Sequence, residues 1–204
     1  GNEIYLTRNK LNGSNFSKER GDDYFHFVLL AKDIEGYHQL CELSTRAWKR
    51  SFVSRRMRRV PTYYQDLKDI IGANPGHIVG STACLGGYTA WCWKQIQSLK
   101  YQEVLPWETS ADLKDANYYL AKLDNHLAAM TELFGQGNFF IELQPNDDVY
   151  GKEQNGYNKF MIERYWGKYP FIFTTDSHYL KAEEREVHKA FLNSKSSKDR
   201  EVDD

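Results

Sequence analysis

Two ionisable side chains near the end of the sequence have the types and spacing best suited to chemistry. The segment FIFTTDSHYL, residues 171–180, separates Asp176 from His178 by a single serine. Side chains two positions apart in an extended chain point to the same side, so we expect this pair to act together. Carboxylate and imidazole groups are ligands of Zn²⁺ and Mn²⁺. The pair therefore fits either a metal site or the polar end of a strand.

Other donor-type residues lie in or directly after predicted strands. Glu3 is in the first predicted strand, His26 is in the second, and Glu142 is inside the apolar run FFIEL. Cys84 follows the run HIVGSTA. Single His and Cys residues are most often core groups, but a carboxylate in an apolar strand is costly to bury unless it is paired or metal-bound. Together with the Asp-x-His pair, these residues raise the expectation of a metal site.

The apolar pattern predicts strands that alternate with helices. Strands are expected at residues 2–6, 24–32, 77–83, 138–144 and 170–180, and helices at 34–49, 63–71, 88–99, 111–135, 155–169 and 182–191. Asp33 is a suitable N-cap for the first helix, and Gly135 ends the fourth. The apolar run Phe27–Ala31 is typical of a strand in a parallel sheet that is covered on both faces. The alternation favours a mostly parallel α/β sheet or barrel, in which the strand ends gather at one face.

Composition narrows the class of protein. A length of 204 residues fits one domain, and the three cysteines are too few for a disulfide scaffold, so reduced thiols in the cytoplasm are expected. No apolar run approaches the roughly 18 residues of a membrane span, so no membrane partner is expected. The balance of 27 basic and 28 acidic residues gives no overall attraction to nucleic acid.

A single basic cluster departs from this balance. Residues 49–59, KRSFVSRRMRR, contain six Lys and Arg residues. The candidate DNA contacts in it are Arg55, Arg56, Arg58 and Arg59. Such a cluster suits DNA phosphates, but a solvated basic loop is an equally good interpretation of the sequence.

Five segments in a fixed order make the sequence similar to the PHP (polymerase and histidinol phosphatase) domain family. They are GNEIYL, HFVLLAKDIEGYHQL, STACLGG, FFIELQ and TTDSHYL. The resemblance extends from Gly1 to about Asn193, and HFVLLAK and ACLGG resemble the branch found in DNA polymerase III alpha subunits of bacteria and phages. It implies a distorted (β/α)7-type barrel around as many as three Zn, Mn or Fe ions.

The resemblance also implies roles for individual residues. The implied metal ligands are the glutamate of G-x-E, the histidine that begins HFVLLA, the cysteine of ACLGG and the closing D-x-H pair, which are Glu3, His26, Cys84, Asp176 and His178. Glu142 matches a strand glutamate of the family, and its role stays open between a metal ligand and a group that supports the ligands. No catalytic residue separate from the metal ligands is implied.

The sequence departs from the family at its start. The family's first motif, an H-x-H followed by further Asp and His ligands, is absent, and there is no initiator Met. We therefore expect an incomplete barrel that lacks its N-terminal strands. Residues 1–193 are expected to form the PHP domain, and residues 194–204 a polar linker toward an absent polymerase region.

The resemblance implies a part of a replicative DNA-directed DNA polymerase, a nucleotidyltransferase that works on DNA with replisome subunits such as a proofreading exonuclease. In an intact domain it implies metal-dependent 3′–5′ exonuclease or phosphoesterase activity, in which a bound ion lowers the pKa of water. One alternative is a non-catalytic scaffold that stabilises the polymerase and binds the proofreading subunit. A weaker alternative is a stand-alone PHP phosphoesterase. The chain alone is expected to be inactive.

Overall fold

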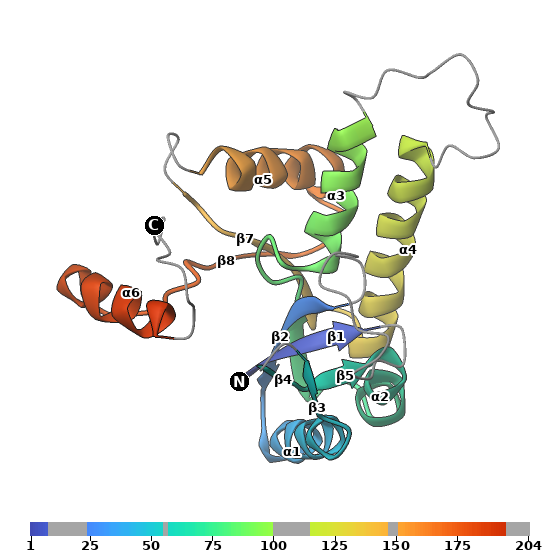
Figure 1. The fold of residues 1–204 in the computed structure, drawn as a ribbon. Helices are drawn as coiled ribbons and strands as arrows, with labels where there is room; N and C mark the ends of the chain where they lie inside the picture. The colour runs from blue at the N-terminus through green and yellow to red at the C-terminus, as the bar shows by residue number, and fades with distance from the viewer. Residues whose placement is uncertain (8–23, 55–56, 100–114, 147–150, 195–204) are drawn as a thin grey trace.

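A mixed six-stranded β-sheet forms the centre of the computed structural model, which describes residues 1–7, 24–54, 57–99, 115–146 and 151–194 (Figure 1). The strand order is β5-β1-β2-β6-β7-β8. These strands are β1 (Asn2–Thr7), β2 (Phe25–Ala31), β5 (Pro61–Tyr63), β6 (Ile78–Ser81), β7 (Phe139–Leu143) and β8 (Phe171–Phe173). A separate hairpin consists of β3 (Phe52–Ser54) and β4 (Met57–Arg59).

Parallel pairing dominates the sheet but does not include β2. The pairs β1–β5, β6–β7 and β7–β8 are parallel, whereas β2 is antiparallel to both β1 and β6. The prediction of a parallel neighbourhood for Phe27–Ala31 was therefore wrong. Phe27 and Leu29 are buried on one face, while Val28 and Leu30 lie on the other. The continuous apolar run therefore indicates a strand with apolar side chains on both faces. It does not indicate whether the strand is parallel or antiparallel to its neighbours.

The helices agree with the sequence pattern, with shifted ends. They are α1 (Ile34–Lys49), α2 (Tyr64–Leu67), α3 (Tyr88–Leu99), α4 (Ala116–Phe134), α5 (Lys152–Tyr165) and α6 (Arg185–Asn193), with a π-helix, η2 (Lys68–Gly72), after α2 and a 3₁₀ turn, η3 (Ala182–Glu184), before α6. Asp33 caps α1 through the Gly36 N–H at 2.9 Å, and Gly135 is the C-cap of α4, as predicted. The predicted start of the fourth helix, residues 111–114, lies outside the described residues.

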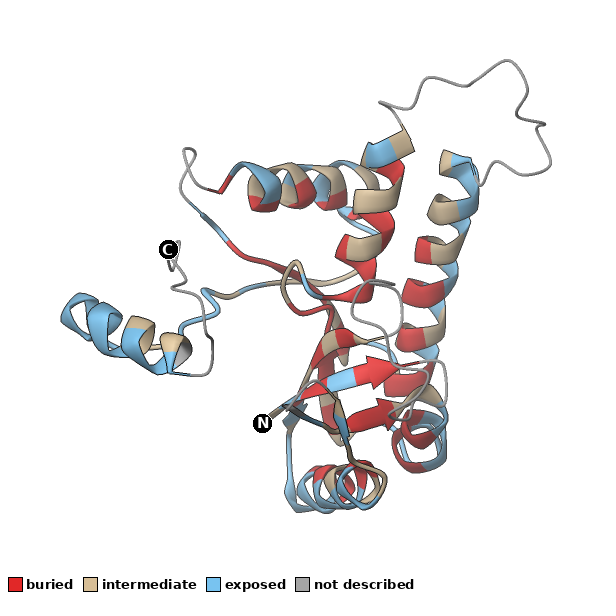
Figure 2. Ribbon diagram, in the orientation of Figure 1, coloured by how far each residue is buried: buried red, intermediate tan, exposed pale blue. Residues whose placement is uncertain are grey.

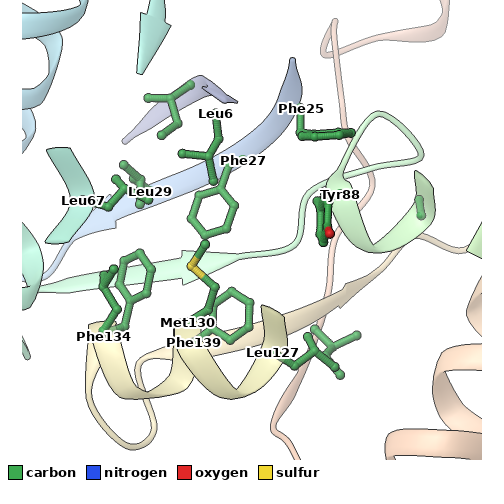
Figure 3. Packing of buried hydrophobic residues seen from close by; sticks show 14 of the residues in the cluster. Leu6, Phe25, Phe27, Leu29, Leu67, Tyr88, Leu127, Met130, Phe134 and Phe139 are labelled. Carbon is green, nitrogen blue, oxygen red and sulfur yellow. The ribbon is translucent and has the colours of Figure 1, made fainter. Parts of the chain in front are cut away.

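The core lies between the sheet and the helices, with buried residues from α1, η2, α3, α4 and α5. Figure 3 shows Phe27 from β2, Phe134 from α4 and Phe139 from β7 packed together, and their ring centroids lie 5.9–6.1 Å apart. Each is buried, and burying such a side chain contributes about 1.5–3 kcal/mol. The sheet face that carries Phe27 and Phe139 anchors the strands, so the side chains on the opposite face have fixed positions.

The opposite face of the sheet is less covered. Glu3 and Tyr5 on β1 are exposed and His26 on β2 is half-buried, because each alternates with a buried neighbour such as Ile4 or Phe27. Figure 2 shows the buried residues concentrated on the sheet and the adjoining helix faces, whereas α6 is mostly exposed and stands apart from the other helices. In the part of the chain that the structure describes, β5 and β8 are the two edge strands of the sheet. They do not pair with each other, so the sheet is open between them.

A buried ion pair fixes the end of α1 to the start of α2. The Arg50 guanidinium donates to both carboxylate oxygens of Asp66, one of them at 3.0 Å, and Asp66 also accepts from the Tyr63 N–H at 2.9 Å. The Arg50 guanidinium lies 4.2 Å from the centre of the Tyr63 ring. The hydrogen bonds to Asp66 raise the pKa of Arg50. This contact also holds β5 next to β1, since Tyr63 ends β5.

Replacing Asp66 is expected to destabilise the fold. Asp66→Ala removes the acceptor for Arg50 and Tyr63 at a side chain that is 7% exposed, and we expect a loss of about 3 kcal/mol in the free energy of unfolding. Asp69→Ala is the control, because Asp69 is 47% exposed and its ion pair with Arg46 spans 3.6 Å. Urea unfolding measures both, and equal losses in the two variants would contradict this account.

Candidate metal centre

The antiparallel pairing of β1 with β2 brings Glu3 to His26. In this register Glu3 lies opposite Val28 and Tyr5 lies opposite His26, so Glu3 and His26 are diagonal neighbours on the same face. Glu3 Oε1 lies 2.7 Å from His26 Nδ1. The carboxylate therefore holds the imidazole in place at the open face of the sheet.

The loop after β6 adds Cys84 to this pair. Its turn is closed by a hydrogen bond from the Gly87 N–H to the Cys84 carbonyl at 2.9 Å, and the His26 N–H donates to the Gly86 carbonyl at 3.0 Å. Cys84 Sγ lies 3.6 Å from His26 Nδ1 and accepts from the Gly86 N–H at 3.4 Å. Burial raises the pKa of the Cys84 thiol, and the charges of Asp176 and Glu3 raise it further, whereas the Gly86 N–H opposes the shift.

The two glycines of ACLGG are needed for close packing as well as for the turn. A Cβ atom at Gly86 would lie 2.9 Å from Cγ of the His26 ring, and one at Gly87 would lie 2.1 Å from the Thr82 carbonyl oxygen. A side chain at either position would force the loop away from β2. The two glycines therefore permit a tight turn directly beside His26.

The arrangement of Glu3, His26 and Cys84 does not match a nucleophilic triad. Glu3 and Cys84 both approach the same ring nitrogen of His26, whereas a triad needs its acid and its nucleophile on opposite ring nitrogens. With Zn–N near 2.0 Å and Zn–S near 2.3 Å, tetrahedral nitrogen and sulfur ligands lie about 3.5 Å apart. The 3.6 Å between Sγ and Nδ1 matches this separation. Among the described residues, no group of three or more His, Cys, Asp or Glu side chains is arranged so that it could hold a metal ion.

Glu142 is buried on the same face of the sheet, on β7, and is held by neutral donors. Its carboxylate accepts from the Ser81 and Thr174 hydroxyls, each at 2.5 Å, and from Gln144 Nε2 at 3.0 Å. Its N–H donates to Thr82 Oγ1 at 2.9 Å. Hydrogen bonds to both oxygens offset the cost of burying the carboxylate. This arrangement favours the interpretation of Glu142 as a support for neighbouring groups.

Sequence reasoning missed the groups that hold Glu142. Ser81 ends β6, Thr174 directly follows β8, and β7 lies between these two strands. The only signal was the position of hydroxyl residues at the ends of two apolar runs. That signal becomes meaningful only when the strand order is known.

Asp176 and His178 do not lie in a strand. β8 ends at Phe173, and Asp176 has a left-handed backbone with φ of 50°. The expectation that an extended chain points both side chains to one side was therefore wrong, because the chain turns at Asp176. The Nδ1–H of His178 donates instead to the Asp176 carbonyl oxygen at 2.6 Å.

These two residues line a polar cavity of about 460 Å³. Gln144, Gln154 and His188 also line it, and the His178 and His188 ring centres are 5.4 Å apart. Asp176 also lines a second cavity of about 210 Å³, which includes Glu142. The charge of Asp176 contributes to the raised pKa of the Cys84 thiol, after the larger effect of burial.

The basic cluster is partly described. Arg58 lies on the β3–β4 hairpin and donates to the Ser51 hydroxyl at 3.0 Å, whereas Arg55 and Arg56 lie outside the described residues. Arg59 ends β4, and its charge acts on Tyr24 near β1. The sequence pattern did not predict this hairpin.

The fold and the site together define a class of protein: a mixed α/β domain with carboxylate, imidazole and thiol groups gathered at the open face of its sheet. Residues 1–146 match the family described as PHP domain. The chain belongs to the PHP domain family. PHP domains are generally metal-dependent, which agrees with the donor types gathered here.

Relatives with this domain are much longer proteins. The chain is 37% identical over all 204 residues to "Probable DNA polymerase YorL" of Bacillus subtilis and to "DNA-directed DNA polymerase" of Bacillus phage SPbeta, and covers 15% of each. It is 28% identical over 184 residues to "DNA polymerase III subunit alpha" of Thermus aquaticus, covering 88% of this chain and 12% of that protein. No helix in the described ranges has the length and apolar character needed to cross a membrane.

A methyl group at Gly86 is expected to displace His26. In Gly86→Ala the new Cβ meets the imidazole ring, so the ring signals of His26 should shift in the NMR spectrum and the free energy of unfolding should fall by about 1–3 kcal/mol. Gly72→Ala is the control, because a Cβ there would make only an ordinary contact with Leu133 at 3.8 Å. Unchanged His26 signals in the Gly86 variant would show that the loop does not position this ring.

Proposed function

We propose that this chain is the PHP domain of a DNA-directed DNA polymerase of the polymerase III alpha type, with a metal centre at the open face of its sheet. The observation that carries the proposal is the convergence of Glu3, His26 and Cys84, which come from two strands and a distant loop. The names of the relatives support the polymerase context, since the chain aligns along its whole length with two proteins named DNA polymerase.

The proposed centre comprises Glu3, His26, Cys84, Asp176 and His178, with Glu142 as a support. An imidazole and a thiol beside carboxylates suit Zn²⁺, and the carboxylates also suit Mn²⁺. A bound ion would lower the pKa of a water molecule and offset negative charge on a phosphodiester. Glu3 orients His26, and the Gly86 N–H steadies the Cys84 sulfur. We propose metal-dependent phosphodiester hydrolysis, such as a 3′–5′ exonuclease, as the activity of this site.

The proposed domain continues beyond residue 146. Asp176 and His178 share a cavity with Gln144, which supports including the chain through α6, to residue 193, in the same domain. The open face of the sheet carries the apolar side chains Val28, Leu30, Val79, Phe140 and Ile172, which line one cavity. This apolar lining supports the proposal that the sheet forms part of a β/α barrel.

A scaffold that binds a partner protein is the second candidate function, and exposed apolar side chains favour it. Ile34, Tyr37 and Trp48 are exposed on α1 at a helical spacing that places them on one stripe, away from the buried Leu40 and Leu43. Val187 and Phe191 are exposed on α6. Surfaces of this kind mark protein contacts, and the proofreading subunit is the proposed partner.

Metal analysis tests the proposed centre directly. We expect Zn or Mn to copurify with the chain and to be lost in His26→Ala and in Cys84→Ser, because each change removes one of the converging donors. His38→Ala is the control, since His38 is exposed on α1. Elemental analysis by mass spectrometry gives the number of ions per chain. Equal metal content in all four proteins would rule out the proposed centre.

Hydrolysis separates the two candidate functions. The full-length polypeptide is incubated with end-labelled single-stranded DNA, with and without a chelator. An exonuclease predicts chelator-sensitive shortening that His26→Ala lowers by at least about 100-fold. A scaffold predicts that wild type and His26→Ala leave the DNA equally intact while both retain the partner.

A further inference from the structure

Two tyrosines form a stacked pair directly beside the candidate metal centre. The rings of Tyr5 and Tyr24 are nearly parallel, at 9°, and their centres are 4.4 Å apart. Tyr5 also contacts His26 edge-on, with ring centres 5.1 Å apart. Tyr5 is 38% exposed and lies on the same face of β1 as Glu3, two residues away. The aromatic pair is therefore next to the donors and reachable from solvent.

The stack is fixed to the basic hairpin. The Tyr24 hydroxyl accepts from the Val60 N–H at 3.2 Å, and Val60 directly follows Arg59. Burial raises the pKa of Tyr24, whereas this hydrogen bond and the charge of Arg59 oppose the shift. Pro61, the next residue, lies opposite Tyr5 in the β1–β5 register. The end of β4 and the tyrosine stack are thus held together at one edge of the sheet.

Three kinds of side-chain group therefore lie in succession along this edge of the sheet. Arg58 and Arg59 on the hairpin offer guanidinium groups, the Tyr5–Tyr24 stack offers an aromatic surface, and Glu3, His26 and Cys84 offer metal-type donors. A single strand of nucleic acid presents matching groups, since phosphates bind Arg and unpaired bases stack on aromatic rings. A duplex hides its base faces inside the helix and would not match the stack.

We propose that the Tyr5–Tyr24 stack binds one unpaired base of single-stranded DNA, with Arg58 and Arg59 contacting its phosphates and the adjacent phosphodiester lying at the Glu3–His26–Cys84 cluster. This inference deepens the proposed function and rests on it for the choice of DNA. Tyr5 is thereby a positioning residue for the substrate. Its side chain provides a stacking surface and takes no part in the chemistry.

Binding of short oligonucleotides tests the stack without turnover. The probe is fluorescein-labelled oligothymidylate in a chelating buffer, and fluorescence anisotropy gives the Kd for the full chain. We expect Tyr5→Ala to weaken binding by at least about 5-fold, the lower end for loss of one base–aromatic stack, and Tyr5→Phe to bind like wild type. Tyr118→Ala is the matched control, because Tyr118 on α4 is 39% exposed. Equal Kd values for wild type and Tyr5→Ala, or no binding by wild type, would overturn the proposal.

An abasic residue moved along the oligonucleotide separates stacking from a general loss of folding. In wild type we expect one position at which the missing base weakens binding, and we expect this position effect to disappear in Tyr5→Ala. A misfolded variant would instead bind every oligonucleotide more weakly and keep the position effect, which would count against the stack. Arg58→Ala should lower the slope of log Kd against log salt by about one. An unchanged slope would remove Arg58 from the proposed path.

The same proteins distinguish failure of this inference from failure of the proposed function. Wild type that binds DNA through Tyr5 but holds no Zn or Mn would support the stack and contradict the metal centre. Wild type that holds metal while Tyr5→Ala binds DNA unchanged would contradict the stack and leave the metal centre in place. An equally tight complex with an oligouridylate would show that the stack does not distinguish RNA from DNA, which would overturn the choice of DNA.

Discussion

The antiparallel pairing of β1 with β2 is the constraint on which the rest of the site depends. It buries Ile4, Leu6 and Phe27 against the helices and, because side chains alternate, presents Glu3 and His26 on the opposite face. A slip of one residue would exchange the two faces, so the apolar core itself fixes the register that joins the carboxylate to the imidazole. Burial of the core therefore also stabilises the strand register that brings Glu3 next to His26.

Polar groups added to this pair are held by close packing and by hydrogen bonds. The ACLGG loop reaches His26 only because Gly86 has no side chain, and this approach brings the Cys84 sulfur to the imidazole. Glu142 stays buried because hydroxyl and amide donors from both flanking strands and its own strand end satisfy its oxygens. The contacts of Glu142 require β6, β7 and β8 to be neighbours, whereas the approach of Cys84 to His26 requires β6 beside β2.

The two proposed functions would rely on two separate surfaces of the domain. The edge with the tyrosine stack and the basic hairpin is the surface proposed for a nucleic-acid strand, while Ile34, Tyr37 and Trp48 form an exposed apolar stripe on α1, away from the buried Leu40 and Leu43. The chain spans 15% of the length of the two relatives that it matches over its whole length. The proposed hydrolysis and the proposed partner binding would use different surfaces of the domain.

The sequence by itself determined the alternation of strands and helices and the cap at Asp33, because these follow from local periodicity and capping chemistry. Strand direction was not determined, since an apolar run such as Phe27–Ala31 has the same pattern in either direction. Nor was the turn at Asp176, where the strand stops after Phe173 although β-favouring residues continue. Only the tertiary structure decided that Glu3, His26 and Cys84 meet at one ring nitrogen, that hydroxyls hold Glu142, and that Tyr5 stacks on Tyr24. These contacts join residues far apart in the chain, and pairing and packing alone bring them within reach.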